Sequence, residues 1–245
     1  CSLHEQSNQR NLCTGKAQKM KELTDDLLQK IEGIRDHVQE FRNEGRTFFA
    51  SSSFQTHSLP MLHLLGQIAP EMPVYFIQTG FHFPNTLRIR DEVAKAFGIN
   101  VLNIESHVPK VQQRDAKGNF YFTSDPDYCC FLNKTQPMQP LLERFDIWVN
   151  GVRADQNANR KNLKSFENTP QGGMRFHPML DWSKQEIWQY ISIMDLPRHP
   201  LDAAGYVSIG CEPCTMKPAM GDEREGRWVG QNKTECGLHT ELISK

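Results

Sequence analysis

Four cysteines in two short segments have the spacing that most directly indicates chemistry. Cys129 and Cys130 are adjacent, and Cys211 and Cys214 enclose a Glu-Pro pair about eighty residues later. Four thiolates can hold a tetrahedral zinc ion or an iron–sulfur cluster. Structural zinc usually takes ligands two to four residues apart, whereas neighbouring cysteines can bind different irons of a cubane. The spacing favours a cluster, and zinc or unrelated buried or redox thiols are the alternatives.

A further cysteine, Cys236, lies in the polar C-terminal segment, in the run Glu235-Cys-Gly-Leu-His239. A thiol in such a segment does not serve core packing, and its reactivity depends on the fraction present as thiolate. Arg224, Arg227 and a protonated His239 are cations that would raise this fraction. The sequence therefore predicts that Cys236 is a nucleophile, and the alternative is an incidental thiol on a disordered tail.

A serine-rich turn covers residues 51–58 and follows a short apolar run. A strand that ends in small hydroxyl residues and opens into a helix presents several backbone N–H groups, which form an anion site. An ordinary loop that caps a helix is the alternative. The Gly-Lys-Ser/Thr signature of phosphate loops is absent from this turn, so a kinase-like or GTPase-like function has no support.

Arg153 follows Gly151 just beyond a predicted strand at 146–150. Ligands of open parallel sheets bind at the carboxyl ends of the strands. Arg153 is therefore a candidate for a bidentate grip on an oxyanion, and a solvated surface arginine is the alternative.

The elements that must position these residues alternate between strands and helices. Helical periodicity runs from 21 to 41, a second helix follows the serine-rich turn through 65, and a third runs from 84 to 97, with Gly98 as its stop. Strands are predicted at 73–78, 100–104 and 146–150, and Asp181 or Ser183 is expected to cap another helix. This alternation predicts an α/β fold with a doubly wound, mostly parallel sheet. We expect a polar stretch and packing helix at 1–44, an α/β domain with the anion site and the paired cysteines at 45–220, which the resemblance given below makes nucleotide-binding and cluster-binding, and a mobile tail at 221–245.

Composition excludes several classes of function. The 245 residues carry 28 Lys and Arg against 29 Asp and Glu, a balance that argues against nucleic-acid binding. No apolar run is long enough to span a membrane, and residues 1–22 lack the apolar core of a signal peptide. The seven cysteines are not arranged as in a small disulfide-stapled domain. We expect a cytoplasmic protein with reduced thiols, and a homo-oligomer is compatible with the sequence.

Together, these residues resemble the assimilatory sulfonucleotide reductases, over about residues 45–240. The most specific pieces are the ECGLH run at 235–239, the four paired cysteines and the REGRW run at 224–228. Weaker pieces lie at 79–86 and 151–156. The resemblance implies an adenine-nucleotide alpha hydrolase-like fold and reduction of adenylyl sulfate, or its 3'-phosphorylated form, to sulfite.

The resemblance also implies roles for individual residues. The turn at 51–58 would hold the nucleotide through Ser52, Ser53 and Gln55, and the four cysteines would bind a [4Fe-4S] cluster. The phosphosulfate would be neutralised by Lys134, Arg153, Arg224 and Arg227. Cys236 would attack the sulfate sulfur, and His239 would support the anion or the thiolate, or else be solvent-exposed. Thioredoxin or glutaredoxin would then release sulfite from the sulfonated cysteine.

The chain departs from the family pattern at three places. Many cluster-bearing members carry an acidic Gly-Ala-Glu-Asp-like turn, where this chain has residues 54–57 without a carboxylate. Asn133 replaces an arginine before Lys134, and Ala154 replaces a second arginine. The four cysteines favour adenylyl sulfate, while the neutral turn should tolerate a 3'-phosphate. We therefore expect adenylyl sulfate as the preferred substrate, with phosphoadenylyl-sulfate reduction, an ATP-dependent adenylating enzyme and a non-catalytic zinc module as alternatives.

Overall fold

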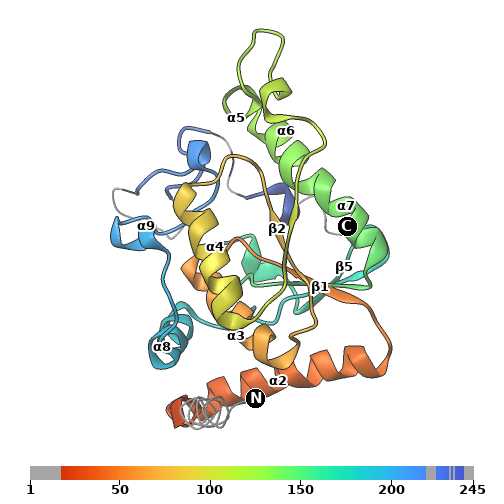
Figure 1. Cartoon of the computed structure of the whole chain (residues 1–245), viewed down its shortest axis with the longest axis vertical. Helices are drawn as coiled ribbons and strands as arrows, with labels where there is room; N and C mark the ends of the chain where they lie inside the picture. The colour runs from red at the N-terminus through yellow and green to blue at the C-terminus, as the bar shows by residue number, and fades with distance from the viewer. Residues whose placement is uncertain (1–17, 219–224, 232, 234, 240–245) are drawn as a thin grey trace, which may run out of the picture.

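The computed structural model describes residues 18–218, 225–231, 233 and 235–239, and centres on one six-stranded sheet (Figure 1). The strand order is β3-β2-β1-β4-β6-β5. The strands are β1 (Phe48–Ser51), β2 (Val74–Ile77), β3 (Val101–Ile104), β4 (Ile147–Asn150), β5 (Phe166–Asn168) and β6 (Met174–Phe176). Only β5 and β6, among these strands, pair antiparallel. The predicted mostly parallel sheet is confirmed.

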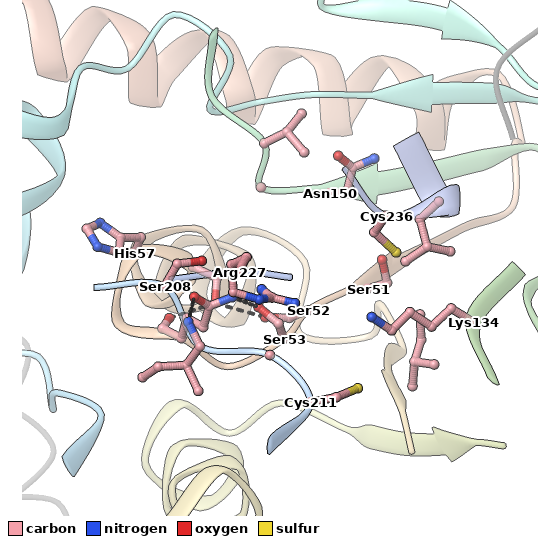
Figure 2. A pocket seen from close by; sticks show the side chains of 18 of the residues that line it. Ser51, Ser52, Ser53, His57, Lys134, Asn150, Ser208, Cys211, Arg227 and Cys236 are labelled. Atoms are coloured by element: carbon pink, nitrogen blue, oxygen red, sulfur yellow. Dashed lines mark hydrogen bonds between the residues drawn. The ribbon is translucent and has the colours of Figure 1, made fainter. Parts of the chain in front are cut away.

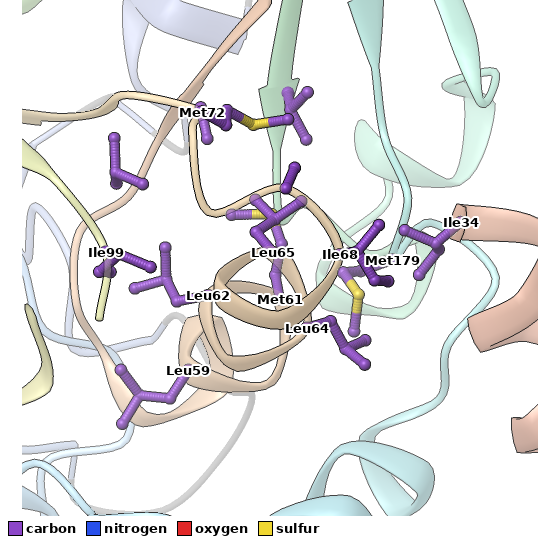
Figure 3. Packing of buried hydrophobic residues seen from close by; sticks show 14 of the residues in the cluster. Ile34, Leu59, Met61, Leu62, Leu64, Leu65, Ile68, Met72, Ile99 and Met179 are labelled. Carbon is purple, nitrogen blue, oxygen red and sulfur yellow. The ribbon is translucent and has the colours of Figure 1, made fainter. Parts of the chain in front are cut away.

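Helices cover both faces of this sheet, as a doubly wound fold requires. The larger core contains α2 (Asp25–Asn43), α3 (Leu59–Ile68), α4 (Pro84–Phe97) and α8 (Lys184–Met194). On the opposite face, α7 (Gln136–Arg144) packs against a smaller core. Successive side chains of β1 point to opposite faces of the sheet, so that Ala50 belongs to the larger core and Phe49 to the smaller. Figure 3 shows how α3 fills the larger core with its apolar side chains.

The order in which the strands are added to the sheet reverses between β1 and β4. From β1 it proceeds outward to β2 and β3, and then returns to place β4 on the other side of β1. The carboxyl ends of β1 and β4 therefore frame the crevice in which open α/β sheets bind their ligands. Ser51 ends β1 and Asn150 ends β4.

Local sequence signals account for the helix ends. Ser183 caps α8 through a reciprocal pair with Glu186, so Ser183, and not Asp181, is the cap. Gly98 ends α4 in the left-handed conformation, with φ of 65°, as predicted. The helix predicted at 21–41 is observed as α2, which begins after its cap, Thr24.

Several elements were not predicted. They are the short antiparallel pair β5–β6, the helices α5 (Tyr121–Ser124), α6 (Pro126–Cys130) and α9 (Pro200–Ala203), and α7. A π-helical turn, Phe131–Thr135, joins α6 to α7. Short 3-10 turns occur at Thr56–Ser58, Lys110–Gln112, Ala154–Gln156, Arg160–Asn162, Glu212–Cys214 and Gly237–His239. Among the described residues, no helix has the length and apolar character to cross a membrane.

The division into segments at 44 and 220 stays a prediction. Residues 1–17 and 219–224 of the outer segments lie outside the described residues. The described part of the C-terminal segment packs against the α/β domain and does not project from it: Trp228 and Cys236 are both buried.

Candidate active site at the crossover of the sheet

A pocket opens at the carboxyl ends of β1 and β4, where the strand order reverses. Its volume, counting the space that is open to solvent, is about 1150 Å³. Figure 2 shows Ser52, Ser53 and His57 toward one side of the pocket and Lys134 and Cys236 toward the other. Of the predicted site residues, the pocket is lined by Ser52, Ser53, Gln55, Lys134, Arg227, Cys211 and Cys236.

Hydrogen bonds within the serine turn hold its shape. The Ser52 hydroxyl accepts from the backbone N–H of Phe54 at 3.1 Å, and Phe54 has the left-handed φ of 54°. The Gln55 side chain donates to the Ser53 hydroxyl at 3.1 Å and accepts from the backbone N–H of Ile209 at 2.7 Å. Gln55 therefore ties the turn to a segment far along the chain, and both segments line the pocket.

Lys134 brings a cation to the pocket from the π-helical turn. Burial lowers the pKa of its ammonium, but the nearby thiols of Cys236, Cys211 and Cys130 raise it by more, so that the net shift is upward. Figure 2 shows the ammonium extending into the pocket on the side of Ser51 and Cys236. Lys134 thus remains charged where a negatively charged ligand would lie.

Arg227 reaches the pocket because glycine occupies position 210. A Cβ atom at Gly210 would lie 2.1 Å from Arg227 Nη2, so the guanidinium fills the space of that missing side chain. The guanidinium carbon lies 4.5 Å from the centroid of the Trp228 ring, and Arg227 is 9% exposed. This packing keeps a second permanent cation at the pocket wall.

The Cys236 thiol lies inside the pocket and is only 8% exposed. A hydrogen bond from the Cys130 thiol holds the pKa of Cys236 well below its usual value, and Lys134 adds to this, against the opposing effects of burial and of Glu235. The same hydrogen bond and burial raise the pKa of Cys130. Cys236 therefore carries the thiolate of this pair, which is the nucleophilic form.

The paired cysteines line one small cavity next to the pocket. Burial and the neighbouring Cys211 and Cys214 raise the pKa of Cys129 to about 11. Among the described residues, no three His, Cys, Asp or Glu side chains converge as ligands of a single metal ion. Cys129, Cys130, Cys211 and Cys214 all line this cavity.

Two polar side chains approach this group of sulfur atoms. The Thr79 hydroxyl lies 3.3 Å from the Sγ atom of Cys211, and Asn133 Nδ2 lies 3.6 Å from the Sγ atom of Cys129. Hydrogen bonds to sulfur are a usual means of stabilising cluster thiolates. The replacement of a family arginine by Asn133 therefore leaves a hydrogen-bond donor beside the predicted ligands.

Arg153 does not line the pocket, contrary to prediction. Its side chain is fully buried, and its Nε atom lies 2.9 Å from Asp155 Oδ1. The backbone N–H of Arg153 also bonds to the side chain of Gln156, so the residue braces the loop after β4. Arg224 and the side chain of His239 lie outside the described residues.

The structure adds residues that the sequence analysis missed. Arg160 lines the pocket where Arg153 was expected, and lies at the start of the 3-10 turn Arg160–Asn162. Asn150 also lines it, and both polar atoms of its buried amide lack a hydrogen-bond partner among the described residues. Its place at the end of a predicted strand was the available signal. His82 lines the pocket as well, and burial lowers its pKa to about 4.

The fold and this pocket define a doubly wound α/β protein whose site carries a thiol beside two cations. The model of the phosphoadenosine phosphosulfate reductase domain matches residues 47–217. The chain therefore belongs to the sulfonucleotide reductase family, oxidoreductases of sulfate assimilation that require a thiol reductant.

Curated relatives agree on the family but differ in the substrate they are named for. An adenosine 5'-phosphosulfate reductase of Rhodococcus erythropolis is 41% identical over 182 residues, which cover 73% of each chain. A phosphoadenosine 5'-phosphosulfate reductase of Gloeobacter violaceus is 36% identical over 200 residues, covering 80% of this chain and 83% of the relative.

Solved structures show the same fold. A phosphoadenylyl-sulfate reductase of Candida auris superposes with a TM-score of 0.61 at 23% identity, over 75% of this chain and 88% of that one. An FMN adenylyltransferase of Candida glabrata superposes with a TM-score of 0.52 at 15% identity, over 78% of this chain and 66% of that one. The predicted adenine-nucleotide alpha hydrolase-like fold is confirmed.

Proposed function

We propose that this enzyme reduces adenylyl sulfate to sulfite and AMP through a sulfonated Cys236. The observation that carries the proposal is the position of the Cys236 thiol, which shares one pocket with Lys134, Arg227 and the serine turn. A nucleotide held by Ser52 and Ser53 would direct its phosphosulfate toward the two cations. The sulfate sulfur would then lie within reach of the thiolate.

The first step is nucleophilic substitution at sulfur. The Cys236 thiolate forms a bond to the sulfate sulfur, and the bond from that sulfur to the bridging oxygen breaks and releases AMP. The leaving oxygen belongs to a phosphate, which is stable as an anion, so no strong general acid is needed. Lys134 and Arg227 stabilise the negative charge that moves onto this oxygen.

The second step uses two electrons from a dithiol protein, for which we propose thioredoxin or glutaredoxin. The dithiol displaces sulfite from the sulfonated cysteine, becomes a disulfide and leaves the Cys236 thiol regenerated. Free thiols require a reducing compartment, which supports a cytoplasmic location.

Cys129, Cys130, Cys211 and Cys214 would hold a [4Fe-4S] cluster. Cys130 would then bind iron as a thiolate and could not donate to Cys236, so that Lys134 would be the group that lowers the pKa of Cys236. The shared cavity and the nearby Thr79 and Asn133 support this assignment. Such a cluster would supply structural support and local charge, because the dithiol already supplies both electrons. Lys134 lines both this cavity and the substrate pocket, and would connect the two electrostatically.

Mass spectrometry tests the nucleophile. Incubation with adenylyl sulfate in the absence of a dithiol should add one sulfonate to the peptide that contains Cys236. Cys236→Ser should abolish this mass and sulfite release while nucleotide binding persists, because a hydroxyl is a far weaker nucleophile at neutral pH. A sulfonate found instead on Cys214 or Cys130 would refute the assignment.

A further inference from the structure

The amide of Asn150, at the end of β4, lines the candidate active site (Figure 2). The residue is only 4% exposed, and neither Oδ1 nor Nδ2 has a hydrogen-bond partner among the described residues. Buried amides are nearly always paired, because an unpaired polar group has lost its hydrogen bonds to water without replacing them. An unpaired amide in the wall of a pocket is therefore a candidate for contact with the ligand.

The residues next to Asn150 are held by the protein itself. Ser51, its partner across the β1–β4 ladder, accepts a hydrogen bond at 2.7 Å from the indole N–H of Trp148. A Cβ atom at Gly151 would lie 3.3 Å from Met61 Sδ, so the backbone just after Asn150 packs closely against α3. The amide therefore projects from a rigid strand end, as a preorganised binding group requires.

The amide lies close to the proposed phosphate site. Ser52 and Ser53, which we propose to hold the nucleotide, directly follow Ser51 in a turn suited to a phosphate. Ser51 and Asn150 are paired on neighbouring strands, whose backbones lie about 5 Å apart. In the nucleotide, the ribose is joined directly to the phosphate, and the adenine lies one sugar ring farther away. The sugar is therefore the first uncharged part of the nucleotide that Asn150 can reach.

The chemistry of the amide also fits the sugar. Asn150 offers donors at Nδ2 and an acceptor at Oδ1, so a ligand that satisfies both must itself accept and donate. Phosphate and sulfate oxygens only accept, and would leave Oδ1 facing negative charge. The 2'- and 3'-hydroxyls of ribose each donate and accept, and they lie side by side on one face of the ring. Oδ1 can accept from one hydroxyl while Nδ2 donates to the other.

We propose that Asn150 binds the ribose diol through both ends of its amide, an inference that rests on the proposed binding of a sulfonucleotide in this pocket. The two ends have nearly the same shape, so a half-turn about χ2 exchanges the donor and the acceptor. When a 3'-phosphate replaces the 3'-hydroxyl, Nδ2 can donate to the phosphate and Oδ1 can accept from the 2'-hydroxyl. Asn150 thus determines specificity: its amide accommodates both sulfonucleotides, whereas a carboxylate at this position would repel the phosphorylated one.

Nucleotide affinities test the contact with the diol. The probes are AMP, 2'-deoxy-AMP and 3'-deoxy-AMP, and calorimetry on the full chain measures their dissociation constants. Asn150→Ala should weaken AMP binding by about tenfold, because two hydrogen bonds are lost. It should weaken each deoxynucleotide by about threefold or less, because one of those bonds is already missing. The nucleotides are compared within each variant, so a smaller folded fraction cannot imitate this difference.

Asn150→Asp tests the exchange of donor and acceptor. A carboxylate still accepts from the diol, so the affinity for AMP should stay within about threefold. It cannot donate to a 3'-phosphate, so adenosine 3',5'-bisphosphate should be weakened about tenfold more than AMP. Asn168 is the matched control, since it also ends a strand, β5, but is exposed and lies outside the pocket lining. Asn168→Ala and Asn168→Asp should leave every affinity unchanged.

The outcomes separate this contact from the proposed function. Equal losses for AMP and both deoxynucleotides in Asn150→Ala, or no loss for any of them, would overturn the contact with the diol. A loss that occurs for AMP but not for inosine monophosphate would place the amide on the base and would overturn it as well. So would equal weakening of AMP and the bisphosphate in Asn150→Asp. Absence of a sulfonate on Cys236 of the unaltered enzyme would instead overturn the proposed function, and the affinities would still decide the role of Asn150.

Discussion

The Thr56 hydroxyl donates a hydrogen bond to the carboxylate of Asp202, although 146 positions separate the two residues. Thr56 lies in the serine turn and is fully buried, and Asp202 lies in α9. Residues 54–57 contain no acid, as the sequence analysis notes. The fold nevertheless places a carboxylate from another segment, that of Asp202, against this turn.

Asp202 provides a first prediction, about substrate choice. We expect the enzyme to prefer adenylyl sulfate and to retain measurable activity on the 3'-phosphorylated form. Asp202→Asn removes a negative charge beside the nucleotide turn. It should raise kcat/KM for the phosphorylated substrate relative to adenylyl sulfate by about fivefold, the factor equivalent to ~1 kcal/mol of repulsion. Steady-state kinetics with both nucleotides and saturating thioredoxin measures the ratio.

His57→Asp is the opposing variant for the same measurement. His57 lines the pocket, so a carboxylate there should lower kcat/KM for the phosphorylated substrate relative to adenylyl sulfate. Thr56 is unsuitable for this purpose because an acid at that buried position would face Asp202 directly. A tenfold preference of the unaltered enzyme for the phosphorylated nucleotide would overturn the substrate proposal and leave the mechanism intact.

The second prediction concerns Lys134. Its ammonium lowers the pKa of the Cys236 thiol, after the hydrogen bond from Cys130, so Lys134→Met should move the pH midpoint of Cys236 alkylation upward. Loss of the charge at the leaving group should also lower kcat/KM by about 100-fold. Lys110→Met is the control, since Lys110 lies over the Phe81 ring outside the pocket lining. An unshifted midpoint would show that Lys134 does not act on the thiol.

The third prediction concerns the cysteine cavity. Replacing any one of the paired cysteines by serine should reduce iron content, visible absorbance and thermal stability together, because cluster binding and folding are coupled. Anaerobic purification followed by iron and sulfide analysis measures this. Cys1 and Cys13, which lie outside the described residues, serve as controls and should be replaceable with little effect. Unchanged iron in Cys211→Ser would contradict the four-ligand set.

Much of the scaffold could be predicted because its signals are local. These signals come from residues that are close together in the sequence: the periodic apolar positions of α2, the apolar runs of the buried strands, and Gly98 at the end of α4. The placement of the serine turn at the carboxyl edge of the sheet then followed from parallel topology, whereas Asn150 was not singled out. The strands β5 and β6 were missed because they have three residues each, too few for a periodic signal.

The choice between two arginines on one loop could not be predicted. Arg153 and Arg160 both follow β4, and the sequence pattern favoured the former. In the structure Asp155 and the Gln156 side chain hold Arg153 inside the loop, while Arg160 reaches the pocket and Glu235. Which cation faces a ligand depends on contacts between distant segments, and sequence spacing does not encode these contacts.

The fourth prediction is a loss of stability in mild acid. Burial lowers the pKa of His82 and His199 to about 4 and that of His177 to about 3. Below the unfolded value near 6.5, the unfolded chain binds protons that the folded chain does not, so stability falls with falling pH. Each histidine contributes up to about 1.4 kcal/mol per pH unit in this window.

Urea unfolding at several pH values between 7.5 and 5.5 measures this slope. Ordinary carboxylates stay ionised in this range, because their pKa values lie near 4. His177→Gln should reduce the slope by removing one of the three groups, whatever its effect on stability at pH 7.5. A free energy of unfolding that is flat over this range would contradict the assignment.

The fifth prediction links core packing to the nucleotide turn. A Cβ atom at Gly66 in α3 would lie 2.6 Å from the backbone oxygen of Phe97, at the end of α4. Gly66→Ala must therefore push α3 away from α4 and should cost about 1–3 kcal/mol of stability. Gly33 is the matched control: it is also helical and has nothing within 4 Å of its Cβ position. Gly33→Ala should stabilise the fold by about 0.5–1 kcal/mol.

Since α3 begins directly after the serine turn, Gly66→Ala should also raise KM for the nucleotide, and Gly33→Ala should not. Equal melting temperatures and equal KM values in the two variants would show that the α3–α4 contact is looser than the structure describes.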